Sequence, residues 1–158
     1  MAGKNFTVPA VYIILERVNE VLLSRRFQTG YQDGNYNLPA GHVDEGELPL
    51  AALLREVKEE IGVELILEDV RFVHTMYRAK ADMTGQRADY FFTTTKWKGE
   101  PKNLEPDKCD DVRWFTYDNL PEKMTPHVRL ALENAKRGIA FSELPIEYFK
   151  ENGYNVSC

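Results

Sequence analysis

The spacing of apolar and polar positions changes along the chain, and this spacing distinguishes predicted strands from predicted helices. Segments rich in β-branched and aromatic residues are typical of buried strands. We place these strands at residues 8–15, 21–26, 64–66, 70–77, 87–97 and 112–117. A polar segment at 17–20 joins the first two strands and is short enough for a hairpin turn.

One segment has the period of an amphipathic helix instead. Its apolar residues are Leu50, Leu53, Leu54, Val57 and Ile61. At 100° per residue these side chains fall on one face, which we expect to be buried. Pro49 suits the first turn of this helix, where its missing N–H costs nothing. Gly62 suits the left-handed position that ends a helix.

A second helix is predicted at 126–136, with Thr125 as its N-cap and Gly138 as its terminator. Much of its buried side is expected to come from Leu130, Leu132 and Ala135. Because strands and helices are mixed, the pattern predicts an α+β or α/β class with a sheet between helices.

The remaining segments read as connections. Polar residues, glycines and prolines predict loops at 28–37 and 99–111 and turns at 82–86 and 118–121. The segment from Ile139 to the end is aromatic and is expected either to pack on the body or to form a dimer contact. With no repeat and no linker, we expect one domain over 1–158.

The first helix also carries a second face of carboxylates. Glu56, Glu59 and Glu60 lie at positions i, i+3 and i+4. Close carboxylates repel one another and need a compensating cation, of which Arg55 supplies at most one charge. Mg²⁺ typically binds a few carboxylates and shares its other positions with water and substrate phosphate. The alternative is a solvated acidic face, as is common on glutamate-rich helices.

The spacing around these carboxylates favours the metal site. The stretch 41–63 reads GHVDEGELPLAALLREVKEEIGV. Its fixed residue types would match by chance with a probability on the order of 10⁻⁷. The stretch resembles the Nudix box, G-x₅-E-x₇-R-E-U-x-E-E-x-G-U with U apolar, and meets every fixed position. The box positions with a proposed role are Gly41, Glu47, Arg55, Glu56, Glu59, Glu60 and Gly62.

This resemblance implies a fold and a chemistry. The fold would be the α/β Nudix fold, an α/β/α sandwich around a mixed sheet. The activity would be hydrolysis of nucleoside diphosphates linked to another group, with Mg²⁺ or Mn²⁺ as the cofactor. The implied metal ligands are Glu56, Glu59, Glu60 and the carbonyl of Ala40. Arg55 and Glu47 would orient these carboxylates.

A further carboxylate from outside the helix often completes such sites in the family. The candidates in this chain are Glu100, Glu105 and Asp107, each of which is otherwise a solvated loop residue. We favour Glu105, because GEPKNLEPDKC followed by VRWF resembles a segment of the MutT-like enzymes. That branch, which includes an enzyme for modified purine nucleotides, cleaves nucleoside triphosphates to monophosphate and pyrophosphate. The expected catalytic residues are Arg55, Glu59, Glu60 and Glu105.

The nucleobase is expected to contact the loop before the box. Asn37 is the first choice with Tyr36, because the Asn37 amide both donates and accepts hydrogen bonds. Tyr36 is equally well explained by packing. Tyr90 and Phe92 are more typical of the core than of a pocket wall. His42 either contacts phosphate or is an exposed or structural residue.

Composition limits the partners and the compartment. The formal net charge of −5 argues against a nucleic-acid polymer as the main partner, since phosphate backbones are met by basic surfaces. It does not argue against a small phosphate ligand, because a bound divalent ion reverses the local sign. Cys109 and Cys158 are too few for a disulfide framework. No apolar run is long enough to span a membrane. We therefore expect a cytoplasmic protein, monomeric or homodimeric, that acts on a small molecule.

Three functions remain open from the sequence. The first is a MutT-like pyrophosphohydrolase of nucleoside triphosphates, including modified or oxidised purines. The second is a Nudix enzyme for ADP-ribose, a nucleotide sugar or a dinucleotide. The third is a non-catalytic module that senses nucleotides. The intact carboxylates argue against the third, because a sensor need not keep side chains that repel one another.

Overall fold

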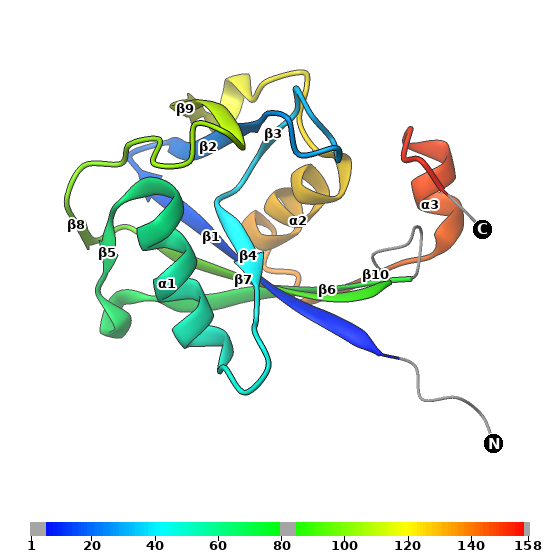
Figure 1. Ribbon diagram of the computed structural model, residues 1–158, viewed down its shortest axis with the longest axis horizontal. Coiled ribbons are helices and arrows are strands. Elements are labelled where there is room, and N and C mark those ends of the chain that lie inside the picture. Colours follow the sequence, from blue (N-terminus) through cyan, green and yellow to red (C-terminus); the bar gives the residue numbers. More distant parts are fainter. Residues whose placement is uncertain (1–5, 80–84, 157–158) are drawn as a thin grey trace.

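The computed structural model describes residues 6–79 and 85–156 (Figure 1). The strands are β1 (Thr7–Arg17), β2 (Glu20–Arg26), β3 (Tyr36–Asn37), β4 (Ala40–His42), β5 (Glu64–Leu65), β6 (Arg71–Arg78), β7 (Gln86–Thr94), β8 (Trp97–Lys98), β9 (Cys109–Thr116) and β10 (Phe141–Leu144). The α-helices are α1 (Pro49–Ile61), α2 (Pro126–Lys136) and α3 (Ile146–Glu151). Two short 3₁₀ helices are η1 (Leu67–Asp69) and η2 (Tyr117–Asn119).

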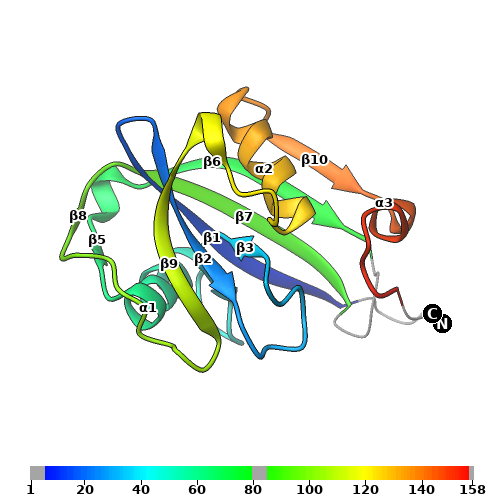
Figure 2. The same ribbon diagram turned by 90° about the horizontal axis from the view of Figure 1, so that it is seen from above.

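Strand β1 is the centre of a mixed sheet with the order β10-β6-β7-β1-β2-β3. It runs parallel to β7 along its length, from Thr7 opposite Gln86 to Leu15 opposite Thr94. Its other edge pairs antiparallel first with β4 and then, at its end, with β2. Strand β9 pairs with β2. Figure 2 shows β10 at the outer edge of the sheet beside β6, with α3 following it.

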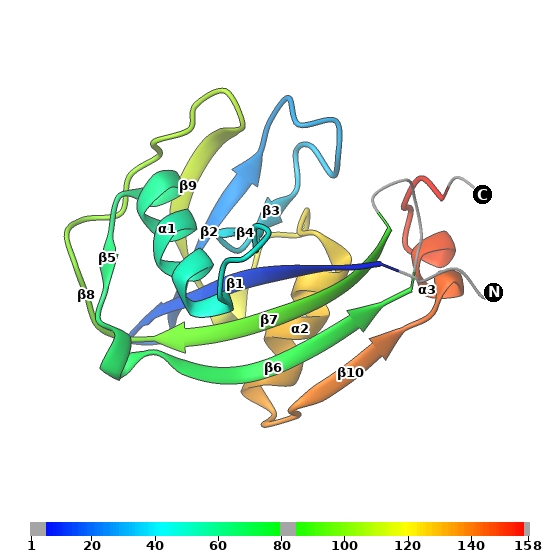
Figure 3. The same ribbon diagram turned by 60° about the horizontal axis from the view of Figure 1, so that its bottom comes forward.

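Alternation along β1 divides the core into two clusters. Val11, Ile13 and Leu15 pack with α1, whereas the even-numbered residues from Ala10 to Ile14 pack with α2. Helices therefore cover both faces of the sheet, and Figure 3 shows α1 and α2 on opposite sides. This arrangement confirms the predicted α/β/α sandwich around a mixed sheet.

Both predicted helices are present at the predicted boundaries. Helix α1 ends at Gly62, whose φ of 73° is left-handed as expected. Helix α2 begins after Thr125, but the Thr125 side chain makes no capping hydrogen bond. The fully buried positions of α2 include Val128, Ala131 and Leu132. Leu130 and Ala135, predicted on the same side, are partly buried against this cluster.

Several short elements were not predicted from the sequence. Strands β3 and β4 lie in and just after the predicted loop at 28–37 and are too short to show a period of two. Strand β9 begins inside the predicted polar connection, and the strand predicted at 87–97 is divided between β7 and β8. The tail forms β10 and α3, and Phe149 and Tyr154 join the α2 cluster. Residues 82–84 of the predicted turn lie outside the described residues.

Within the described ranges, no helix is long and apolar enough to cross a membrane.

Candidate active site

Strand β4 runs directly against α1 at the first glycine of the 41–63 stretch. A Cβ atom on Gly41 would lie 1.9 Å from Cδ of Glu56. Such a distance is impossible without moving the carboxylate. Gly41 is therefore required for close approach rather than for an unusual backbone conformation.

Arg55 lies among the carboxylates at the start of this site. Its Nε and Nη2 atoms donate to the two oxygens of Glu47 at 3.0 and 2.8 Å. Its Nη1 atom donates to Glu56 at 2.6 Å and lies 3.5 Å from Glu59. The same guanidinium also donates to the carbonyl of His42 at 3.1 Å, which ties α1 to β4. The hydrogen bonds from Arg55, together with one from the Asp44 N–H, lower the pKa of Glu47 to about 2.

Glu60 points from α1 toward the other end of β4. Its Oε2 atom accepts a hydrogen bond from the Ala40 N–H at 3.0 Å. Burial, with a further contribution from the Glu56 and Glu105 charges, raises the pKa of Glu60 to about 8. Burial raises the pKa of Glu56 as well, although Arg55 acts against it. These carboxylates lack sufficient positive charge, which a cation would supply.

The connection after β8 docks on the end of α1. The N–H groups of Lys102 and Leu104 donate to the Ile61 and Glu60 carbonyls at 2.9 and 3.0 Å. These bonds satisfy carbonyls that a helix end leaves without partners. They also carry Glu105 into the same cleft as Glu60. The side chain of Lys108 donates to Glu105 at 2.9 Å.

The other two candidate carboxylates lie elsewhere. Glu100 and Asp107 are exposed and do not line this cleft, which leaves Glu105 as the candidate that the structure brings beside the helix.

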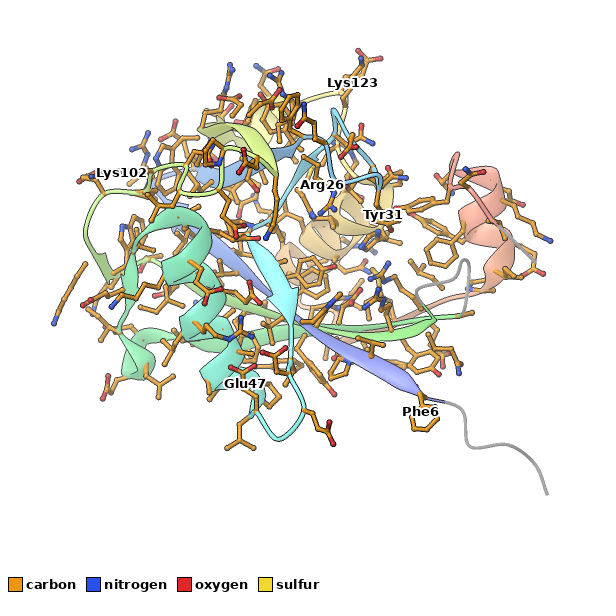
Figure 4. All side chains as sticks on the ribbon, in the orientation of Figure 1. Phe6, Arg26, Tyr31, Glu47, Lys102 and Lys123 are labelled. Atoms are coloured by element: carbon orange, nitrogen blue, oxygen red, sulfur yellow. The ribbon has the colours of Figure 1, made fainter. Side chains whose placement is uncertain are left out.

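Two cavities meet at β4. The first, here called the carboxylate cleft, has a volume of about 90 Å³ and is lined by Ala40, Glu60, Glu105, Lys108 and Asn37, among others. The second, here called the basic cavity, has a volume of about 240 Å³ and lies toward α2. Arg26, Asn37 and Ala40 line both. Figure 4 shows Arg26 and Tyr31 together beyond β4 and Glu47 near the start of α1.

The two residues predicted to meet the base differ in position. Asn37 is buried between the two cavities, and its Oδ1 atom accepts the Leu38 N–H at 2.9 Å. Its amide nitrogen donates to no acceptor of the described residues, so it is available to a ligand in either cavity. Tyr36 lines neither cavity. Its side chain packs on Phe115 in the core and its hydroxyl donates to Asp111, as the packing alternative predicted.

Other aromatic and histidine residues take structural positions. Phe92 belongs to the α1 cluster, and Tyr90 packs against it, as expected for core residues. His74 is fully buried between the Ile139 carbonyl and the Ser142 hydroxyl.

The donor set suits a hard divalent cation, because it consists of carboxylate and backbone oxygens. In the described part of the chain, however, no group of three His, Cys, Asp or Glu residues is already gathered to hold an ion. Glu56 and Glu59 are turned toward Arg55, and Glu60 is turned toward the Ala40 N–H. Binding a cation therefore requires the carboxylates to reorient.

The mixed sheet between two helices, with a glutamate face of α1 beside a small cleft, defines an α/β/α protein of the Nudix type. The chain belongs to this family, since the model for the NUDIX domain matches residues 6–135.

Similar proteins are named as hydrolases. The chain is 32% identical over 123 residues to a protein of *Pseudomonas putida* strain W619 named NAD-capped RNA hydrolase NudC. It is 34% identical over 119 residues to the protein of that name in *Pseudomonas aeruginosa* strain LESB58. The matches cover 72% of this chain but only 38% and 37% of those relatives, so the chain spans well under half of their length.

Solved structures agree on the fold. A MutT NUDIX hydrolase from *Burkholderia pseudomallei* superposes with a TM-score of 0.75 at 27% identity, over 81% of this chain and 97% of that one. A MutT protein from *Methanosarcina mazei* Go1 superposes with a TM-score of 0.71 at 19% identity, over 86% and 97% of the two chains.

Sequence reasoning named Asn37, Ala40, Gly41 and His42 but did not find the arginines of the basic cavity. Its charged side chains Arg26, Arg78 and Arg87 come from three different strands. Arginines on otherwise apolar strands are a signal, because a charge is rarely buried without a partner. Their meeting point depends on strand order, which the pattern of residues does not contain.

Proposed function

We propose that this chain is a Mg²⁺- or Mn²⁺-dependent pyrophosphohydrolase that cleaves nucleoside triphosphates, including modified or oxidised purines, to monophosphate and pyrophosphate. The observation that carries the proposal is the meeting of Glu60 and Glu105 in one cleft beside Glu56. Glu60 is held there without an ion pair to any described cation. Clustered carboxylates beside a cleft are what a bound divalent metal would neutralise.

Glu56, Glu59, Glu60 and the Ala40 carbonyl would hold the metal. The ion would neutralise the phosphoryl oxygens, which otherwise repel an attacking water. Arg55 keeps Glu47 and Glu56 in fixed positions through its hydrogen bonds. Glu105 lines the same cleft and would orient the water or accept its proton. Asn37 would hydrogen-bond the base.

The alternative substrate is a dinucleotide-type diphosphate. Relatives at 30–34% identity are named NAD-capped RNA hydrolases, although this chain spans well under half of their length. The triphosphate is preferred because the 99–109 connection resembles that of MutT-like enzymes and docks Glu105 in the cleft. A small-molecule substrate, a cytoplasmic location and a monomeric or dimeric state remain predictions.

A panel of nucleoside triphosphates, ADP-ribose, a nucleotide sugar and a dinucleotide, assayed with Mg²⁺, tests this function. Release of pyrophosphate rather than phosphate is expected from the triphosphates. Glu60→Gln and Glu59→Gln should each lower turnover at least about a hundredfold with the fold intact. Glu64→Gln is the matched control, because that exposed residue pairs with Lys58 away from the cleft. Normal hydrolysis by both variants would show that the site is wrongly assigned.

Two further variants separate the roles in the cleft. Glu105→Gln should lower kcat with little change in KM, because its interaction strengthens in the transition state. Asn37→Ala should change the preference between purine and pyrimidine by about 1–3 kcal/mol if a buried hydrogen bond is lost. An unchanged base preference in Asn37→Ala would remove Asn37 from recognition.

A further inference from the structure

The basic cavity brings together three arginines, of which only one forms an ion pair with a carboxylate of the described residues. Its lining includes the guanidinium groups of Arg26, Arg78 and Arg87. Asp89 pairs with one of them, Arg78, through hydrogen bonds at 2.6 and 3.2 Å, and is itself fully buried. Neither Arg26 nor Arg87 forms an ion pair with a carboxylate of the residues that the structure describes. Arg26 and Arg87 therefore line this cavity without a described carboxylate bonded to either.

Of these two arginines, Arg87 has the greater need of a negatively charged partner, because only 9% of its surface is exposed. Its Nη1 atom donates to Nε2 of His42 at 2.7 Å. That imidazole nitrogen accepts a hydrogen bond but supplies no negative charge. A buried guanidinium needs an anion, since removing it from water is costly. Arg26 donates to the Tyr31 carbonyl and the Thr29 hydroxyl, which are likewise neutral.

His127 adds a neutral donor to the wall. The hydroxyl of Tyr154 accepts the backbone N–H of His127 at 3.1 Å and lies 2.7 Å from its Nδ1 atom. Either ring nitrogen of the neutral imidazole can carry the proton, so the ring supplies one N–H donor and one acceptor. Nε2 faces Tyr12, and both side chains line the cavity. Guanidinium forks and an imidazole N–H are the donors that phosphate oxygens accept.

We propose that the basic cavity binds a phosphomonoester group of the substrate, in addition to the diphosphate that is hydrolysed. This inference rests on the proposed function, because it places the second group of the same substrate. The cavity shares Arg26, Asn37 and Ala40 with the carboxylate cleft, so one molecule can occupy both. A volume of about 240 Å³ has room for a phosphate together with part of the sugar.

Binding of inorganic phosphate to the metal-free protein, measured by calorimetry, tests the cavity without any turnover. Arg87 lines the basic cavity and not the carboxylate cleft, so a variant at this position reports binding in the basic cavity. Arg87→Gln should weaken phosphate binding at least tenfold, and Arg26→Gln should act in the same direction. Arg137→Gln is the control, because that exposed arginine follows α2 and lines neither cavity. Arg87→Lys keeps the charge and replaces Arg87→Gln if the glutamine variant does not fold; it should weaken binding less.

Matched substrate pairs identify the source of the phosphate. A nucleoside triphosphate compared with its diphosphate tests a terminal phosphate, and NADP compared with NAD tests a phosphate on the ribose. In the parent, the member that carries the extra phosphate should have the higher kcat/KM in one of the two pairs. Arg87→Gln should reduce this preference, the ratio of the two kcat/KM values, at least tenfold. Phosphate binding that is unaffected in both arginine variants would overturn the inference. If phosphate binds as expected but no diphosphate is hydrolysed, the proposed function fails while the anion site stands.

Discussion

Gly41 and Glu56 are far apart in sequence but nearly touch in the structure. The carboxylate of Glu56 occupies the space that a side chain on residue 41 would need, at 1.9 Å from a Cβ. The position of the carboxylate is therefore determined partly by the absence of another side chain. Arg55 fixes it from the opposite direction through a 2.6 Å hydrogen bond.

Gly41→Ala should consequently reduce turnover by at least about tenfold while changing stability little. The flexible Glu56 side chain can move away, so the backbone keeps its course, but the carboxylate leaves its place in the site. The measurement is kcat together with the unfolding midpoint in urea. In a Glu56→Ala background the same glycine substitution should cost nothing more, as in a double-mutant cycle. An equal loss in both backgrounds would show that Glu56 is not the cause.

At the scale of single residues, the sequence predicted which types of side chain form the site better than it predicted where each side chain lies. The spacing of Glu56, Glu59 and Glu60 predicted a shared face, and the structure places Glu60 beside Glu105. It did not predict that Glu59 would be more than half exposed, because exposure depends on what packs against the helix. Tyr36 shows the same limit, since adjacent residues on a strand point to opposite faces.

Helix α1 is the element whose two ends decide the site. Its N-terminal half is tied to β4 by Arg55, and its C-terminal carbonyls receive the connection that carries Glu105. Gly62 lies at this second end with a φ of 73°. A Cβ at this position would also come within 2.9 Å of the Leu104 side chain.

Gly62→Ala should therefore destabilise the fold by more than about 1 kcal/mol, because a left-handed backbone and a close contact are both penalised. Unfolding in urea measures the cost. The Leu104→Ala background separates the two causes, since it removes the contact and leaves the backbone strain. There the glycine substitution should cost less than in the parent. An identical cost would assign the whole effect to the backbone, and no cost in either background would contradict the assignment.

The two long helices could be predicted from the sequence, whereas the short strands that form only by pairing with a neighbouring strand could not. Helices α1 and α2 have an apolar face, a proline at the start and a glycine near the end, so their limits follow from local chemistry. Strands β4 and β10 have no such pattern, and they exist because β1 and β6 each offer a free edge. Both cavities lie against β4, which is why the sequence could not outline them.

At the scale of the whole molecule, the N-terminal strand β1 and the C-terminal tail meet at the buried side chain of His127. Tyr12 comes from β1 and Tyr154 from the tail. The NUDIX match ends at residue 135, yet Tyr154 from beyond it fixes the orientation of His127 in the basic cavity. Phe149 and Tyr154 pack edge to face with ring centroids 5.1 Å apart, which anchors the tail to the α2 cluster. The tail thus supports the cavity without lining it.

This arrangement predicts how stability depends on pH. Burial lowers the pKa of His127 well below its ordinary value. The positive charges that act in the same direction come from three strands and are Arg78, Arg26 and Arg87. The folded protein therefore keeps His127 neutral, whereas the unfolded chain takes up a proton near pH 6.5. The stability contributed by this histidine is complete above about pH 6.5 and is lost as the pH falls toward the folded-state pKa.

Urea unfolding at a series of pH values below 7 tests this dependence. The slope contributed by one such histidine is at most about 1.4 kcal/mol per pH unit. Burial also lowers the pKa of His74, so the difference between variants is the measurement rather than the total slope. His127→Gln should flatten the curve, because no proton is then taken up at this position on unfolding. Tyr154→Phe is the matched control. It removes two hydrogen bonds, each worth about 1 kcal/mol, but leaves the imidazole buried, so the curve should shift downward with its slope retained. Equal slopes for His127→Gln and the parent would show that His127 is not held neutral in the folded state.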